Sequence, residues 1–380
     1  MIPTLAPEHE EFRAHIERWV EQRLQPIASE LDQSGVFPHE LFKELGSLGY
    51  FGIMYPEAYG GLGGASPNVH YTILIEELSR ASMAFAGVVC MHAAAATHGI
   101  GAWGSEALRE KYLAPAIRGE KIGAFAITEP NSGSDAASIR TRARKVDGGY
   151  VITGTKMFTS SAPIADFITV AATSDPEKGV QGIGLFLVDT KMPGFSVGRT
   201  IEKFVIHSAD TAETIYEDVF VPDDHRLGDE SGFLNAYRAL TIDRIYTGAM
   251  ALGNARAAYD AALDYAKTRV QFGKPIGKFQ AVQFKLVDML ATLEQARLYV
   301  YHAAELADRG EPITKEAAIA KQIAADGGNQ ICQKALNIFG GYGLTLDFPV
   351  ERYLRDSFFP MIGGGTSDIM RTIAAKQIGL

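Results

Sequence analysis

Cysteine is scarce in this chain, and its scarcity excludes two classes of protein. The 380 residues include only Cys90 and Cys332. Two thiols provide neither the disulfide framework of a small secreted protein nor a zinc site built from cysteines. We therefore expect two buried structural thiols. The low count favours a reducing compartment, so we predict a cytoplasmic location.

Long apolar runs and clusters of positive charge are also missing. The most apolar stretch, 83–91, is too short to cross a bilayer, so we expect a buried helix and no membrane partner. The N-terminus lacks the basic start and apolar run of a signal peptide. The net charge is −9 without any Lys/Arg block, which argues against a nucleic-acid partner. The nine histidines show no metal-ligand spacing, so we expect no metal.

The first third of the chain has helical periodicity. Hydrophobic residues make up 47% of the chain and charged residues 21%, a balance that can bury a large core. Residues 71–86 predict an amphipathic helix with Glu76 and Glu77 facing outward. An earlier apolar stripe recurs every four residues, at Phe12, Ile16, Val20 and Leu24.

The middle third changes to short segments rich in β-branched and aromatic residues, separated by turn signals such as Asp147-Gly148-Gly149. This spacing favours a small antiparallel barrel or sandwich. From about residue 230 the pattern is helical again, and it predicts long helices over 252–270 and 280–306. The clearest strand segments are 151–153, 167–170, 184–188 and 214–216.

The expected fold class is therefore α+β and mainly α. We predict an N-terminal α-helical domain over residues 1–122, a small β-barrel domain over 123–229 and a C-terminal α-helical bundle over 230–380. A chain of this length has room for two or three such domains.

Four segments carry a resemblance to a known family. In this order they resemble the signatures of the acyl-CoA dehydrogenases, and they cover essentially the whole chain. The resemblance implies the fold of that family, FAD as cofactor, an acyl-CoA thioester as substrate and an electron-transferring flavoprotein as partner. The segments are 126–135, 269–274, 337–343 with Arg352 and Asp356 after it, and 365–371.

The resemblance also implies which residues bind the flavin. In the family, the positions of Ile127, Thr128, Ser134, Phe158 and Ser160 lie at the flavin ring, with Ser134 also near the thioester tail. A second set would hold the ADP part of the FAD of a neighbouring subunit, which implies a dimer within a homotetramer. That set and the C-terminal flavin loop comprise Arg269, Gln271, Phe272, Asn337 (where the family usually has Gln), Gly340, Gly341, Thr366 and Asp368.

Taken alone, several of these residues have plainer interpretations. The 128–134 loop is compatible with a solvated turn. Phe158 would more often be a core side chain. Arg269 fits a solvent-facing residue at a helix end as well as a pyrophosphate ligand. The resemblance favours the flavin-binding role in each case.

The catalytic base departs from the family's usual pattern. Most members have Glu directly before the Gly-Thr of the C-terminal loop, where this chain has Gly364. A smaller branch has Glu before an Arg on the helix after the barrel, and the matching pair here is Asp243 and Arg244. We hypothesise that Asp243 is the base. The Gly364 N–H would bind the thioester carbonyl, and Arg244 and Gly365 would contact substrate. The plainer interpretation of Asp243 is a helix-start acid or a surface ion pair.

A shortened base leaves more room above the α-carbon of the substrate. We therefore expect a branched or alicyclic acyl group, such as that of cyclohexane-1-carboxyl-CoA. Three alternatives stay open: an acyl group bound to a carrier protein, a flavin enzyme that uses oxygen, and a non-catalytic thioester-binding scaffold.

Overall fold

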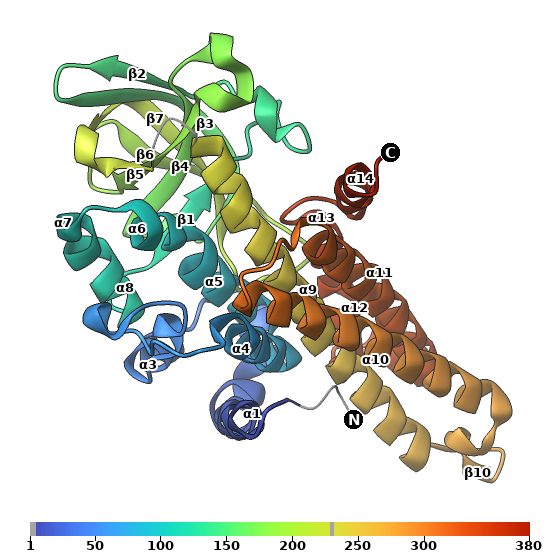
Figure 1. The fold of residues 1–380 in the computed structure, drawn as a ribbon. Coiled ribbons are helices and arrows are strands. Elements are labelled where there is room, and N and C mark those ends of the chain that lie inside the picture. Colours follow the sequence, from blue (N-terminus) through green and yellow to red (C-terminus); the bar gives the residue numbers. More distant parts are fainter. Residues whose placement is uncertain (1–4, 229–231) are drawn as a thin grey trace.

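The computed structural model describes residues 5–228 and 232–380. Helices from both ends of the chain pack around one another, and a sheet sits at one end of them (Figure 1). The predicted helical, β, helical order is therefore confirmed. The predicted boundary between residues 229 and 230 lies outside the described residues. The three-domain division stays a prediction.

From residue 5 onward, the N-terminal region contains eight α-helices, linked in places by short π and 3₁₀ turns. The predicted apolar stripe lies on the first helix and its π-helical continuation Val20–Leu24, and Ile16, Val20 and Leu24 are completely buried. The helices are α1 (Pro7–Trp19), α2 (Ala28–Ser34), α3 (His39–Ser47), α4 (Pro67–Ala81), α5 (Met83–Cys90), α6 (His98–Trp103), α7 (Glu106–Leu108) and α8 (Ala114–Ile117).

Glu76 and Glu77 correct one prediction. Both lie on α4, but they are completely buried rather than outward-facing. Glu76 accepts hydrogen bonds from Arg297, at 2.7 Å, and from the Tyr301 hydroxyl, at 2.6 Å. Glu77 pairs with Arg256 at 2.7 Å. Helices cover α4 on all sides, so its charged face binds other charges instead of water.

One stretch, Met83–Trp103, is long and apolar enough to cross a membrane by length and composition. Of its most apolar window, 83% is buried inside the fold. This segment therefore packs as part of the core, as expected for residues 83–91. Cys90, at its centre, and Cys332 are both buried free thiols, as predicted.

The middle region forms one eight-stranded sheet in the order β6-β7-β3-β2-β4-β5-β8, with β1 paired to β4. The pairing is mostly antiparallel, but β1 runs parallel to β4. The strands β6 and β8 lie at the two ends of this order, where they pair with β7 and β5, and the sheet is the β region expected between the two helical regions. The strands are β1 (Gly123–Ala126), β2 (Arg142–Val146), β3 (Gly149–Ser160), β4 (Phe167–Thr173), β5 (Ile183–Asp189), β6 (Phe195–Thr200), β7 (Thr211–Pro222) and β8 (Arg226–Leu227).

A single long helix joins the sheet to the far end of the molecule. The helix α9 (Gly232–Thr268) begins beside the sheet and ends at a small hairpin, and it starts well before the predicted residue 252 (Figure 1). The predicted 280–306 helix is confirmed as α10. The remaining elements are β9 (Val270–Gln271), β10 (Lys274–Pro275), α10 (Gln280–Asp308), α11 (Thr314–Phe339), α12 (Val350–Asp356), α13 (Phe359–Ile362) and α14 (Ser367–Gln377).

Candidate active site

Asp243 lies on α9 in the interior of the protein, with 6% of its surface exposed. Its Oδ1 accepts a hydrogen bond from the Cys90 thiol at 3.4 Å, and its backbone carbonyl accepts one from the Thr247 hydroxyl at 3.0 Å. Burial raises the pKa of the Asp243 carboxyl, while the Cys90 thiol and Lys321 act in the opposite direction. A carboxylate with a raised pKa is a stronger base than an exposed one.

The loop between α13 and α14 faces this carboxylate. Gly364 has φ of +67° and Gly365 has φ of +101°, a region in which other residues are strained. A Cβ built on Gly364 would lie 3.4 Å from Oδ2 of Asp243. The structure therefore brings Asp243 and Gly364 together. Within the described ranges the Gly364 N–H has no hydrogen-bond partner, so it is free to donate.

Lys321 also belongs to this site, although the sequence analysis missed it. Its side chain is completely buried on α11, and its ammonium donates to the carbonyl oxygen of Gly363 at 2.7 Å and to that of Gly365. Burial lowers the pKa of Lys321 to about 7, and the charge of Asp243 acts in the opposite direction. A sequence signal was present: Lys321 is a lone cation in an alanine-rich stretch of α11.

Arg244, next to the proposed base, is 5% exposed. Its guanidinium donates to the Thr241 hydroxyl at 3.3 Å and lies 5.0 Å from the centre of the Tyr237 ring. Its Nε is buried without a partner in the part of the chain that the structure describes. A buried cation with a spare donor has capacity for a further acceptor.

The predicted flavin-ring residues gather where the loop after β1 meets β3. The Met157 N–H donates to the Thr128 carbonyl at 2.8 Å, which places Thr128 beside Phe158. Ile127 is tied to the same strand, because the buried Lys156 donates to its carbonyl at 3.0 Å. Ser160 follows at the end of β3. The side chain of Ser134 is exposed further along the loop.

A buried ion pair holds this loop, and the sequence analysis missed it too. Lys156 donates to Glu129 at 2.8 Å. The Glu129 carboxylate also accepts from the backbone N–H groups of Arg140, at 2.6 Å, and Thr141, at 2.9 Å. Burial lowers the pKa of Lys156 to about 8 despite the charge of Glu129. The pair fixes the loop against β3.

Phe158 has two features unusual for a strand residue. Its φ is +55°, and 58% of its side chain is exposed. It lies at an irregularity in the pairing of β3 with β7, between Lys156 and Thr159. A bulky residue with positive φ is strained by about 1–2 kcal/mol, and such strain gathers at functional sites. The exposed ring is available to a planar ligand.

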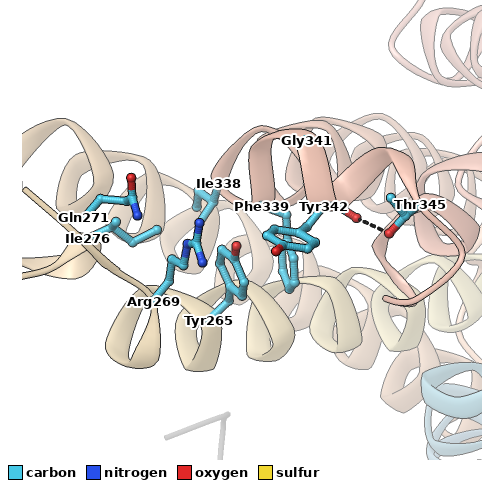
Figure 2. Close-up of a pocket in the computed structure, with 9 residues that line it drawn as sticks. All are labelled: Tyr265, Arg269, Gln271, Ile276, Ile338, Phe339, Gly341, Tyr342 and Thr345. Atoms are coloured by element: carbon cyan, nitrogen blue, oxygen red, sulfur yellow. Dashed lines mark hydrogen bonds between the residues drawn. The ribbon is translucent and has the colours of Figure 1, made fainter.

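The predicted ADP-binding residues lie around a separate pocket. Its volume is about 530 Å³, and Arg269 and Gln271 share it with Gly341 (Figure 2). The Arg269 guanidinium lies 5.3 Å from the centre of the Tyr342 ring. A Cβ on Gly340 or Gly341 would meet nothing within 4 Å, so both glycines border open space. The full lining is Tyr265, Arg269, Gln271, Ile276, Ile338, Phe339, Gly341, Tyr342 and Thr345.

Three residues of this group, Gly340, Phe272 and Asn337, lie outside the pocket lining. Phe272, with φ of +52°, is 92% exposed at the tip of the β9–β10 hairpin, where it forms a tight turn with Gly273. Asn337 is exposed, and its amide donates to the Gln333 carbonyl on its own helix at 2.8 Å. Neither contact shows a ligand role by itself.

The predicted C-terminal flavin loop has local partners of its own. Thr366 caps α14, since its hydroxyl oxygen accepts from the Ile369 N–H at 3.2 Å. Asp368 is paired with Arg371 at 2.9 Å, and its side chain is 91% exposed. Thr366 therefore fixes the end of the loop at the start of α14.

Asp243 and Arg269, a residue of the predicted ADP-binding set, lie far apart within one chain. Asp243 is in the first half of α9, and Arg269 directly follows its last residue, Thr268. With a rise of about 1.5 Å per residue, Arg269 lies roughly 40 Å along the helix from Asp243. Figure 1 shows the β9–β10 hairpin at the end of the molecule away from the sheet.

The fold and the site define a flavoenzyme-like architecture, in which a sheet lies between two helical regions and the buried Asp243 carboxylate faces the Gly364 loop. The chain belongs to the acyl-CoA dehydrogenase family. Models of its N-terminal, middle and C-terminal domains match residues 6–120, 124–219 and 230–379. No described group of three or more His, Cys, Asp or Glu residues is arranged to hold a metal ion.

Three known proteins illustrate the similarity. Benzylmalonyl-CoA dehydrogenase of Aromatoleum aromaticum is 45% identical over 363 residues, 95% of each chain. The caffeyl-CoA reductase-Etf complex subunit CarC of Acetobacterium woodii is 40% identical and covers 93% of each chain. The structure of butyryl-CoA dehydrogenase from Megasphaera elsdenii superposes over 100% of both chains with a TM-score of 0.96 and 38% identity.

Proposed function

We propose that this protein removes hydrogen from the α- and β-carbons of an acyl-CoA thioester, with Asp243 as the base. The chain is an FAD-dependent oxidoreductase of the acyl-CoA dehydrogenase family. The observation that carries the proposal is the buried Asp243 carboxylate facing Gly364, where most of the family has its base. Asp243 takes the α-proton, and the electrons of that C–H bond form the double bond as the β-hydrogen leaves as hydride.

The residues of this chain fit a bound flavin. The exposed, strained Phe158 offers a flat surface, and the polar loop at Ile127 and Thr128, which is held against β3, lies beside it. When bound, FAD accepts the hydride from the β-carbon. Arg269 and Gln271 supply donors suited to phosphate oxygens, and open space at Gly341 admits a close approach of backbone to ligand.

Gly364 has a second role in this proposal. Its N–H lacks a partner in the described chain and lies beside Asp243, so it is suited to bind the thioester carbonyl. Negative charge develops on that oxygen as the α-proton leaves, and a fixed donor stabilises it. Arg244 and Gly365 border the same region and complete the substrate contacts. The backbone N–H of residue 364 is present whether that residue is Glu or Gly, so the glycine of this chain keeps this donor.

Two chains would be needed for each FAD. Arg269 lies roughly 40 Å along α9 from Asp243, further than one dinucleotide extends. A second copy would therefore supply the Arg269 set. Part of α10 presents an apolar surface suited to such contacts, with Phe284, Val287, Leu290 and Leu298 exposed by 62%, 63%, 40% and 44%. We propose a homotetramer built as a dimer of dimers.

The substrate we favour carries a branch or a ring close to the thioester. The short Asp243 side chain and the bare Gly364 leave room above the α-carbon. Benzylmalonyl-CoA dehydrogenase and the caffeyl-CoA reductase subunit are both named for aryl-bearing thioesters. A cyclohexane-1-carboxyl group also carries a six-membered ring and belongs to the same test panel.

An electron-transferring flavoprotein is the proposed electron acceptor, and the name of the CarC relative includes such a partner. The cytoplasm remains the predicted location. The same site is compatible with an acyl group on a carrier protein, because the pantetheine arm is common to both substrates. An oxygen-using enzyme or a scaffold would need no base at Asp243.

The test is anaerobic bleaching of the bound flavin by a panel of thioesters. The panel contains butyryl-, isovaleryl-, cyclohexane-1-carboxyl-, 3-phenylpropionyl- and benzylmalonyl-CoA. Native protein and Asp243→Asn are compared side by side. We expect fast bleaching by branched or ring-bearing compounds in native protein only. If no compound bleaches a protein that holds flavin, the proposal is wrong.

A further inference from the structure

Lys321 is a buried cation without a carboxylate partner in direct contact. Its side chain is completely buried, and among residues 5–228 and 232–380 it forms no ion pair within 4.0 Å. Instead, its ammonium donates to the carbonyl oxygens of Gly363 and Gly365. Burying an ammonium costs free energy unless hydrogen bonds or opposite charges compensate for it, so the buried position of Lys321 needs a structural explanation.

The loop that it binds would be loose without it. Residues 363–365 are three consecutive glycines, which lose more conformational freedom on folding than any other residues. The Gly363 N–H is bound to the Phe359 carbonyl at 2.8 Å, and Thr366 caps α14. Between these anchors, Lys321 is the side chain that binds the carbonyl on each side of Gly364. Its contacts therefore set the direction of the Gly364 N–H.

Lys321 is also next to the proposed base. A Cβ built on Gly364 would lie 3.9 Å from Cε of Lys321 and 3.4 Å from Oδ2 of Asp243. The charged groups that influence Lys321 are Asp243 and Arg244 from α9 and Asp326 from its own helix. Asp326 is already paired with Arg371.

We propose that Lys321 is a positioning residue of the dehydrogenation: its ammonium fixes the Gly363–Gly365 loop, and with it the Gly364 N–H, beside the Asp243 carboxylate. The inference rests on the proposed function, because it assigns Lys321 a part in the same reaction. Two effects of Lys321 are separable by substitution. Hydrogen bonds to the loop require N–H donors, and support of the carboxylate requires positive charge.

Three substitutions separate these effects. Lys321→Met removes both the donors and the charge, Lys321→Gln keeps N–H donors without charge, and Lys321→Arg keeps both. The matched control is Lys334→Met on the same helix, where Lys334 is partly exposed and pairs with Asp288. Each variant is prepared with bound FAD, and flavin content and thermal melting are recorded before kinetics.

The measurement is the pH profile of kcat and KM on a thioester that native protein oxidises. We expect Lys321→Met to lower kcat by roughly ten- to hundredfold, as loss of hydrogen bonds from a charged donor would. Without the cation, the carboxylate binds its proton more tightly. The acidic limb of the kcat profile should therefore move up by about one pH unit in the Met and Gln variants. Lys321→Arg should keep the native limb, and Lys334→Met should match native protein throughout.

Two results would overturn the inference while leaving the proposed function intact. One is an unchanged kcat in Lys321→Met. The other is a lowered kcat with an unshifted acidic limb in both neutral variants, which indicates a merely structural lysine. If Lys321→Met does not fold, Lys321→Gln against Lys321→Arg gives the same decision. If native protein oxidises no thioester, the proposed function is wrong, and the role of Lys321 in that reaction is wrong with it.

Discussion

The Asp243 carboxylate and Gly364 face each other, so a Cβ on Gly364 would lie 3.4 Å from Oδ2 of Asp243. Asp243 therefore supplies the carboxylate, and the glycine at position 364 leaves space for it. Asp243 reaches this place from α9, while Gly364 belongs to the loop before α14. A carboxylate on α9 or on the loop before α14 would therefore reach the same site. Substitutions at positions 243 and 364 test this.

The rate of the reaction should depend on pH through Asp243. Burial raises the pKa of Asp243 above its ordinary value of 3.8. The base must be ionised to accept a proton, so kcat should fall as the pH drops through the raised pKa. Anaerobic stopped-flow bleaching from pH 4.5 to 9 would measure it. An acidic limb of kcat that lies no higher than the ordinary value of 3.8 would argue against Asp243 as the base.

A carboxylate placed at position 364 should partly replace the one at 243. Asp243→Asn should lower kcat by roughly 10²–10⁴-fold, the usual contribution of a general base. Adding Gly364→Glu should recover at least about tenfold of that loss, because the new side chain starts beside the same space. Recovery should be incomplete, since φ of +67° strains any residue other than glycine.

The control for this rescue is Gly364→Gln in the Asp243→Asn background. Glutamine has the size of glutamate but cannot accept the proton, so it should recover nothing. If both double variants recover the same activity, the recovery reflects packing, and a carboxylate at position 364 does not replace that of Asp243. Flavin absorbance of each variant shows whether the site still binds FAD.

The order of helices and strands was predictable because it rests on local periodicity. The 280–306 helix and the strands around 167–170 and 184–188 were found at the expected places. The start of α9 was missed by about twenty residues, since residues 232–251 mix polar and apolar residues in a helix that faces different neighbours. Hydrophobic periodicity identifies a helix that buries one face, and it fails for a helix that buries several faces.

Tertiary partners were not predictable from the sequence. Glu76 and Glu77 look like solvent-facing charges, and only the packing of α4 against Arg297 and Arg256 shows why they are buried. Lys321 likewise looks like an isolated lysine in the sequence. Only the folded structure brings its ammonium to the Gly363 carbonyl of the glycine loop. Asp243 was predicted as the base because a family resemblance named the position, and its contact with Cys90 was not foreseen.

Phe158 gives a prediction with opposite effects on stability and on flavin binding. Glycine accepts the positive φ, so Phe158→Gly should leave the flavin-free protein as stable as native protein or stabilise it by up to about 1–2 kcal/mol. Loss of the aromatic ring should weaken FAD binding by up to about tenfold. Denaturant unfolding of the flavin-free protein and FAD titration measure the two effects separately.

Phe220 provides the matched comparison. It is 49% exposed on β7, in ordinary strand conformation. Phe220→Gly should destabilise the protein, since glycine weakens a strand, and should leave FAD binding unchanged. If Phe158→Gly destabilises the protein as much as Phe220→Gly, the positive φ of Phe158 stores no strain.

The two-chain flavin site predicts complementation between inactive variants. Arg269→Gln should weaken FAD binding by roughly ten- to hundredfold, while Lys278→Gln, an exposed cation outside the pocket, should not. Co-expression of Arg269→Gln chains with Asp243→Asn chains should restore activity. One site of the mixed pair then combines an intact Asp243 with an intact Arg269 from the other chain.

The expected recovery is a fraction of native activity in the doubly tagged, co-purified oligomer. Homo-oligomers of either variant, purified in parallel, should remain nearly inactive. If the mixed oligomer is as inactive as both parents, each chain holds its FAD alone, and the bridged site is wrong.

The buried charge cluster around Glu76 predicts a stability effect far from the proposed chemistry. Burial alone would raise the pKa of Glu76, but Arg297, Arg13 and the Tyr301 hydroxyl lower it from 4.5 to about 2. Glu76→Gln leaves those cations without their carboxylate. Breaking such a buried pair on one side costs about 3–5 kcal/mol. Urea unfolding at pH 7 measures this cost, with the exposed Glu202→Gln as control, which should change stability by less than about 0.5 kcal/mol.

The sign of the pH effect follows from the lowered pKa. A carboxyl whose pKa falls on folding stabilises the native state fully above the unfolded value, near 4.5, and loses this contribution as the pH drops toward 2. The stability difference between native protein and Glu76→Gln should therefore be constant from pH 8 to 5.5 and shrink below about 4.5. A difference that grows on acidification would mean that Glu76 is protonated in the folded protein, and that the cations around it are balanced by Glu77 instead.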